Sequence, residues 1–96
     1  MAKKKVKIFQ TNLFSKKIKK LSKKQKIDLD GAVEKIVKDP TIGTEKKGDL
    51  IGVYVYKFKT STQQLLLAYE WDEESRTLLM IGVHENFYRE IKNYKK

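Results

Sequence analysis

The sequence predicts one α+β domain, in which an N-terminal helical hairpin packs on a small antiparallel β-sheet of about three or four strands and a C-terminal helix follows. Three observations support this prediction. The length of 96 residues suits one domain, residues 1–96, because single domains usually contain about 50 to 200 residues. The apolar residues follow a helical spacing up to residue 38 and a strand-like spacing from residue 53 onward. An apolar content of 40% is enough for a modest core.

The helical hairpin is predicted from two amphipathic segments. Residues 3–9 alternate weakly and predict a short edge strand, after which Thr11 or Asn12 can cap a helix. The apolar stripe of this first helix is Phe14, Ile18 and Leu21. A turn or cap at residues 22–26 leads to a second helix, which ends at Asp39-Pro40 because the residue before proline disfavours the helical conformation. The second apolar stripe consists of Leu29, Val33, Ile36 and Val37.

The sheet is predicted from a change of period after a loop at residues 40–49. Short turns at residues 60–62 and 72–75 separate the apolar runs, which favours an antiparallel meander. The middle run is almost continuously apolar, so we expect it at the centre of the sheet. The expected strands are residues 53–59, 63–71 and 77–83, followed by a helix over 87–94 that Glu85 or Asn86 caps.

The composition excludes several classes of protein. The chain has no cysteine, which excludes disulfide scaffolds, zinc fingers and thiol nucleophiles. Its single histidine excludes a multi-histidine metal site, so we expect neither a metal nor another cofactor. No apolar span of 18 residues and no secretory segment is present, so we expect a soluble cytoplasmic protein without membrane contact.

The net charge of +10 is confined to the first part of the chain. Residues 1–38 contain 13 lysines and three acidic residues, whereas residues 39–96 contain nine basic and nine acidic residues. A lysine-rich surface attracts phosphates diffusely and in a salt-sensitive way, which favours a nucleic acid as partner. A solvated helix surface and an acidic protein partner remain open. The candidate RNA-binding residues are Lys16, Lys17, Lys19, Lys20, Lys23 and Lys24.

Four residues of the second part could carry chemistry. His84 falls at the end of the third expected strand, and Tyr88 follows at i+4. A partly buried histidine and an ordinary helix aromatic would explain this pair equally. Lys57 and Lys59 are same-face neighbours about 6.5–7 Å apart on a strand. A phosphate between them would offset their repulsion, although lysines also protect ordinary edge strands.

Such residues suffice for RNA cleavage by attack of a 2′-hydroxyl. The reaction needs a group that takes the hydroxyl proton, a group that protonates the 5′ leaving oxygen, and cations that stabilise the charge on phosphorus. One histidine, two lysines, an arginine and a tyrosine supply this set without a metal. Glu70 or Glu85 could serve as the base, and the sequence distinguishes neither.

From Lys47 to the C-terminus the sequence resembles the RelE/ParE superfamily of type II toxin–antitoxin toxins. The family's loop, strand and strand-end motifs all have counterparts here in the same order, and the layout of helices and strands agrees. The matching stretches are Lys47-Gly48-Asp49-Leu50, Val55-Tyr56-Lys57-Phe58-Lys59, Leu65-Leu66-Leu67-Ala68-Tyr69 and Leu79-Met80-Ile81-Gly82-Val83-His84-Glu85-Asn86-Phe87-Tyr88-Arg89.

The resemblance implies one of two activities. RelE-like members are mRNA endonucleases that cut codons in the ribosomal A site, whereas ParE-like members poison DNA gyrase without a nuclease residue set. The match favours the nuclease branch, with His84 resembling the YafQ-like catalytic histidine. The implied catalytic residues are His84, Lys57, Lys59, Tyr88 and Arg89. One departure is Leu66, which stands near the position of a phosphate-contacting arginine, so Arg89 is the candidate substitute.

The resemblance also implies the partners. These are an acidic antitoxin that wraps the toxin, the ribosome, whose RNA the lysine-rich hairpin contacts, and mRNA; the toxin alone is expected to be monomeric. The alternatives are a non-enzymatic gyrase poison of ParE type and a nucleic-acid-binding member without nuclease activity.

Overall fold

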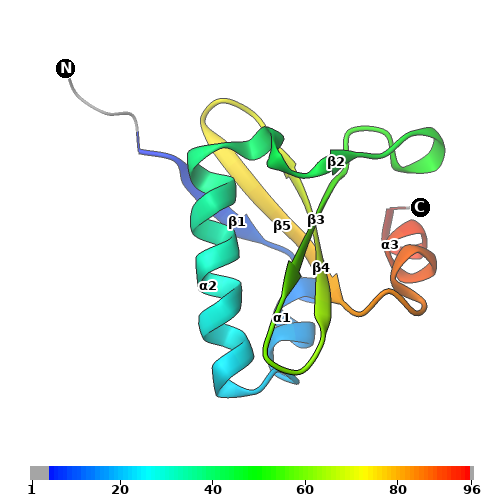
Figure 1. Ribbon diagram of the computed structural model, residues 1–96. Coiled ribbons are helices and arrows are strands. Elements are labelled where there is room, and N and C mark those ends of the chain that lie inside the picture. The colour runs from blue at the N-terminus through cyan, green and yellow to red at the C-terminus, as the bar shows by residue number, and fades with distance from the viewer. Residues whose placement is uncertain (1–4, 96) are drawn as a thin grey trace.

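Five strands form one mixed sheet in the order β1-β5-β4-β3-β2 in the computed structural model, which describes residues 5–95 (Figure 1). The central strands β3 (Tyr54–Lys59), β4 (Gln64–Trp71) and β5 (Ser75–Gly82) are the expected antiparallel meander. At one edge β1 (Lys7–Gln10) pairs with β5 in the parallel direction. At the other edge β2 (Thr44–Glu45) pairs with the start of β3. The predicted α+β class is therefore confirmed, with a sheet that is larger than expected and not purely antiparallel.

The parallel edge strand is held by the residue that also starts the first helix. The Thr11 N–H donates to the carbonyl of Leu78 at 3.1 Å, and the Thr11 hydroxyl donates to the carbonyl of Leu79 at 2.7 Å. The same hydroxyl accepts from the N–H of Phe14 and so caps α1 (Asn12–Ile18). Local alternation predicted the strand but not its partner, which is about 68 residues further along the chain. Lys3 and Lys4 of the expected strand lie outside the described residues.

The helix α2 (Lys23–Lys38) covers one face of the sheet (Figure 1). It begins with a capping box, in which the Ser22 hydroxyl accepts from the N–H of Gln25 and the Gln25 side chain accepts from the N–H of Ser22. The helix ends at Lys38, and Asp39-Pro40 then leads into the 3-10 turn η1 (Pro40–Ile42). Both ends agree with the start and stop signals of the sequence.

The helix α1 is shorter than predicted. Its last turn closes with bonds from the Lys20 N–H to the Lys17 carbonyl and from the Leu21 N–H to the Ile18 carbonyl, so Leu21 lies beyond the helix. Leu13 packs against the core on one side of the sheet, whereas Phe14 belongs to the core on the other side. The helix α1 therefore lies beside β5 and contributes to both layers, rather than lying with α2 on a single face.

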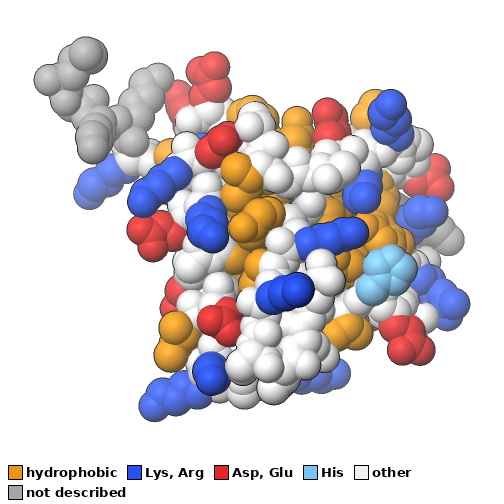
Figure 2. Space-filling model, viewed as in Figure 1, with side chains coloured by type: hydrophobic (Ala, Val, Ile, Leu, Met, Phe, Trp, Pro, Cys, Tyr) orange, Lys and Arg blue, Asp and Glu red, His pale blue; other side chains and the backbone are white. Residues whose placement is uncertain are grey.

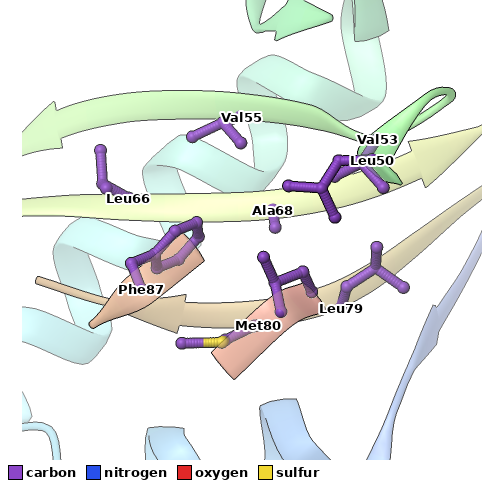
Figure 3. Close-up of a cluster of buried hydrophobic side chains, with 9 residues drawn as sticks. Leu50, Val53, Val55, Leu66, Ala68, Leu79, Met80 and Phe87 are labelled. Atoms are coloured by element: carbon purple, nitrogen blue, oxygen red, sulfur yellow. The ribbon is translucent and has the colours of Figure 1, made fainter. Parts of the chain in front are cut away.

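Alternation along β4 divides the core into two clusters. Leu65, Leu67 and Tyr69 join the cluster under α2. Leu66 and Ala68 join the cluster under α3 (Phe87–Lys95), which Figure 3 shows with Phe87 against β4 and β5. The cluster under α3 consists of Leu50, Val53, Val55, Leu66, Ala68, Leu79, Met80, Phe87 and Ile91. The near-continuous apolar run of β4 thus reflects a strand that is covered on both faces.

Ion pairs complement the apolar docking of α3. Phe87 and Ile91 are fully buried. The Lys95 ammonium lies 2.7 Å from the Glu70 carboxylate of β4, and the Lys17 ammonium of α1 lies 2.6 Å from the carboxylate of Glu90. Together these contacts fix α3 to the sheet and to α1. None of the helices between residues 5 and 95 is long and apolar enough to cross a membrane.

Arg76 joins the C-terminus of α2 to the sheet. The side chain is 95% buried and donates to the carbonyls of Ile36 at 3.1 Å and Val37 at 3.0 Å. It also donates to the carbonyls of Asp72 and Ser75 in the turn before β5. A cation that satisfies the last carbonyls of a helix is favoured by their hydrogen bonds and by the helix dipole. Arg76 is therefore structural and unavailable to a substrate.

We predict that Arg76→Lys destabilises the domain, because one ammonium cannot reach carbonyls on both sides as the guanidinium fork does. Loss of two charge-assisted hydrogen bonds should lower the free energy of unfolding by about 2–4 kcal/mol. Chemical denaturation monitored by circular dichroism would measure this change. Arg89→Lys, at an exposed position of α3, is the matched control and should be neutral. Equal stability of the two variants would contradict the structural role of Arg76.

Candidate functional site

A small pocket lies on the α3 side of the sheet, at the end where β5 leads into α3. Its volume is about 70 Å³, and it is lined by Lys57, Gln64, Leu66 and His84. The strand register produces this grouping, because Lys57 pairs with Leu66 and Leu66 pairs with Gly82, two residues before His84. In Figure 2 the histidine, in pale blue, lies at the surface near lysine and arginine side chains.

A tight turn places Tyr88 beside His84. Asn86 has a φ of 64°, in the left-handed region that asparagine tolerates better than most residues. The N–H of Phe87 donates to the His84 carbonyl, and the N–H of Glu90 donates to the Asn86 carbonyl. The His84 and Tyr88 rings then meet edge-to-face, with centroids 5.7 Å apart and an interplanar angle of 75°. The predicted i+4 pair is thus in direct contact.

Lys46 is a member of this site that the sequence did not reveal. Its ammonium lies 5.1 Å from the centroid of the Tyr88 ring, a cation–π distance. Its backbone N–H donates to the carbonyl of Val53 at 2.8 Å, which fixes the start of the loop that continues into η2 (Gly48–Leu50). The contact joins residues 42 positions apart, and the sequence distinguishes Lys46 from its neighbour Lys47 by no local pattern.

Tyr69 anchors the chain that carries Lys46. Its hydroxyl donates to the carbonyl of Pro40 at 2.6 Å and accepts from the N–H of Gly43 at 3.1 Å. A Cβ at Gly43 would approach this hydroxyl to 2.6 Å, so only glycine fits there. Burial raises the pKa of Tyr69, which keeps the hydroxyl protonated as a donor.

Lys59 and Arg89 lie away from the His84 pocket. Lys59, the last residue of β3, lines a groove between β3 and α2. Arg89 follows Tyr88 by one helical step and lines a different hollow of about 480 Å³ with Asp49 and Lys92. Of the five residues predicted to be catalytic, the structure therefore brings together Lys57, His84 and Tyr88.

The two candidate bases differ in availability. The Glu70 carboxylate is engaged by Lys95 at 2.7 Å and helps to hold α3. Glu85 is exposed and adjacent in sequence to His84. Leu66, at the position where the resemblance leads one to expect an arginine, is 98% buried and gives the pocket an apolar wall. β4 thus contributes no cation to the pocket.

The predicted RNA-binding lysines gather where α1 ends and α2 begins. Five are exposed, namely Lys16, Lys19, Lys20, Lys23 and Lys24. Lys17 differs from them because it is half-buried and paired with Glu90. We call the five exposed residues the lysine cluster. Its free charges offer repeated contacts to an anionic partner, whereas Lys17 stabilises the fold.

The geometry of the His84 pocket suits a phosphate ester. Lys57 supplies a positive charge, and the imidazole of His84 can donate or accept a proton at the same place. Tyr88 holds the imidazole edge-to-face and exposes part of its ring, on which a base can stack. Lys46 adds a second cation on the far side of that ring.

Comparisons with known proteins agree with the earlier resemblance. Residues 8–92 match the family model of the ParE-like toxin of type II bacterial toxin–antitoxin systems. No curated protein sequence matches the chain. The fold is similar to a chain in the crystal structure of the intact E. coli RelBE toxin–antitoxin complex, with a TM-score of 0.65 and 19% identity. That match covers 80% of this chain and 94% of the other.

The structural similarity confirms the predicted fold at an identity too low to carry an activity. The family model covers almost all of the described residues, from β1 to the last turns of α3. The protein therefore belongs to the family of ParE-like toxins of type II bacterial toxin–antitoxin systems.

Proposed function

We propose that this toxin is a ribosome-dependent mRNA endonuclease that inhibits translation. The observation that carries the proposal is the presence of Lys57 and His84 in one pocket, with Tyr88 against the imidazole. An acid–base group, a cation and an aromatic ring at one place match the needs of attack by a 2′-hydroxyl on the adjacent phosphate. The proposed reaction uses no metal.

Each side chain has a distinct role in the proposed reaction. The scissile phosphate lies against Lys57, whose charge stabilises the additional negative charge that develops on the phosphate oxygens. His84 acts as the main acid or base. Tyr88 orients both His84 and the substrate base, and Lys46 helps to hold the Tyr88 ring. Lys59 and Arg89, in the neighbouring hollows, serve as auxiliary cations for phosphates further along the strand.

The lysine cluster provides the proposed docking surface for ribosomal RNA. It lies on α1, α2 and their connection, apart from the residues that line the His84 pocket. Docking and chemistry would therefore use separate surfaces, and removal of one should leave the other intact.

We propose an acidic antitoxin as the regulatory partner. The solved relative is a toxin–antitoxin complex, and this chain carries a net charge of +10. A negatively charged segment is complementary to this charge in both rate of association and specificity. Covering the His84 pocket or the lysine cluster would each block the proposed activity.

We predict that His84→Ala abolishes most of the cleavage while the domain remains folded, because His84 is exposed. Loss of a general acid or base should slow cleavage by about a hundredfold or more. The measurement is inducible expression with mapping of mRNA 5′ ends, together with the thermal midpoint of the purified variant. Glu73→Ala, in the exposed turn between β4 and β5, is the control and should cleave like the wild type.

A gyrase poison of ParE type is the second candidate function, and the apolar wall at Leu66 favours it. That activity predicts intact mRNA, induction of DNA repair and unchanged toxicity of His84→Ala. These results would refute the nuclease proposal. Toxicity that requires His84, accompanied by cuts at codon positions of translated messages, would refute the gyrase alternative. A family member without nuclease activity would leave both transcripts and DNA intact.

We also predict that binding to purified ribosomes weakens steeply with salt. Each phosphate contact contributes a slope of about −0.7 to −0.9 to log K against log salt, so five contacts give about −3.5 to −4.5. The double variant Lys19→Gln, Lys20→Gln should reduce the slope by almost two contacts. Lys5→Gln, Lys7→Gln removes the same charge from the exposed N-terminal edge and serves as the control. Equal slopes for both double variants would contradict docking through the lysine cluster.

A further inference from the structure

The groove between α2 and β3 contains features that the fold itself does not require. Its volume is about 380 Å³. Ile27, Gly31 and Lys35 line it from α2, and Tyr56, Phe58 and Lys59 line it from β3. Figure 2 shows hydrophobic side chains exposed between these two elements, with lysine or arginine side chains on both sides. The groove is separate from the His84 pocket, with which it shares none of these residues.

Gly31 is the first unexplained feature. It lies inside a 16-residue helix, where glycine costs about 1 kcal/mol relative to alanine. A Cβ at this position would meet no heavy atom within 4 Å, so close packing does not require glycine. Ile27, one turn earlier, is 64% exposed. The missing side chain leaves the α2 wall of the groove open beside an exposed apolar residue.

The opposite wall is an aromatic platform. The rings of Tyr56 and Phe58 are nearly parallel, at an interplanar angle of 16° with centroids 6.2 Å apart. Both side chains are half-buried, because one part of each packs against the core under α2 and the rest faces solvent. An exposed, firmly supported ring is the surface on which proteins stack unpaired bases.

Cations flank this platform. Lys35 on α2 and Lys59 on β3 are both exposed, and neither forms an ion pair within residues 5–95. Asp28 also lines the groove, so the charge of its lining is +1. A positive groove that follows the backbone, combined with aromatic stacking, is the usual arrangement for single-stranded nucleic acids. The Asp28 carboxylate can accept a hydrogen bond from a base amino group.

We propose that this groove is a second binding site for single-stranded RNA. One base stacks on Tyr56 and Phe58, and the adjoining phosphates contact Lys59 and Lys35. The identification of RNA rests on the proposed function. β2 pairs only with Tyr54 and Val55, so the outer edge of β3 beyond them has no neighbouring strand in the described structure. A strand that crosses this edge passes from Lys57 in the His84 pocket to Lys59 in the groove.

The test is binding of a fluorescent 2′-O-methyl RNA of about 12 nucleotides, which cannot be cleaved by attack of a 2′-hydroxyl. Gly31→Gln fills the groove at a position where a Cβ meets no atom, so its thermal midpoint should equal or exceed that of the wild type. Fluorescence anisotropy should show an affinity at least about fivefold weaker, because one stacked base is lost.

A charge-matched pair extends the test. Lys35→Gln and Lys26→Gln each remove one exposed lysine from α2, but only Lys35 lines the groove. Lys35→Gln should therefore weaken RNA binding more than Lys26→Gln, and it should reduce the salt slope by about one phosphate contact.

Unchanged RNA affinity of folded Gly31→Gln would overturn the second site, as would equal effects of the two lysine variants. Weaker antitoxin binding by Gly31→Gln with unchanged RNA affinity would also overturn it, since the groove would then be a protein-docking surface. The proposed nuclease fails independently. If mRNA stays uncut in cells while Gly31→Gln still weakens binding of the uncleavable RNA, the groove remains and only the catalytic assignment is lost.

Discussion

The alternation of side chains along β4 is the constraint on which the rest of the structure depends. Leu65, Leu67 and Tyr69 support α2, while Leu66 and Ala68 support α3. A slip of one residue would exchange the two faces and misplace both layers. The same register aligns Lys57, Leu66 and Gly82, so it also determines where the His84 pocket forms. In a domain of 96 residues, the core and the site are therefore specified together.

The candidate site lies where this frame ends, on elements that are held from several directions. Buried Phe87 and Ile91 dock α3, and ion pairs to Glu70 and Lys17 add to the docking. Tyr88 is thereby fixed between the His84 ring and the Lys46 ammonium. Such support matters because acid–base and electrostatic catalysis depend on geometry that is established before the substrate arrives.

Local periodicity predicted α2, the three-stranded meander and α3, because each is encoded by consecutive residues. It could not predict that β1 pairs in parallel with β5, since that pairing joins the two ends of the chain. The resemblance and strand-end position anticipated Lys57, His84 and Tyr88 as neighbours. Contacts between distant loops explain why Lys46 and the structural role of Arg76 were not anticipated. Lys59 and Arg89 point to separate hollows, which spacing along one strand or helix does not reveal.

The central claim is that Lys57 and His84 act on one phosphate, and a double-mutant cycle tests it most directly. Single-turnover cleavage of mRNA on programmed ribosomes would be measured for Lys57→Ala, His84→Ala and the double variant. Groups that act as a unit have strongly non-additive effects. The double variant should therefore be only slightly slower than the slower single variant. A double variant slowed by the full product of the two single effects would contradict a shared site.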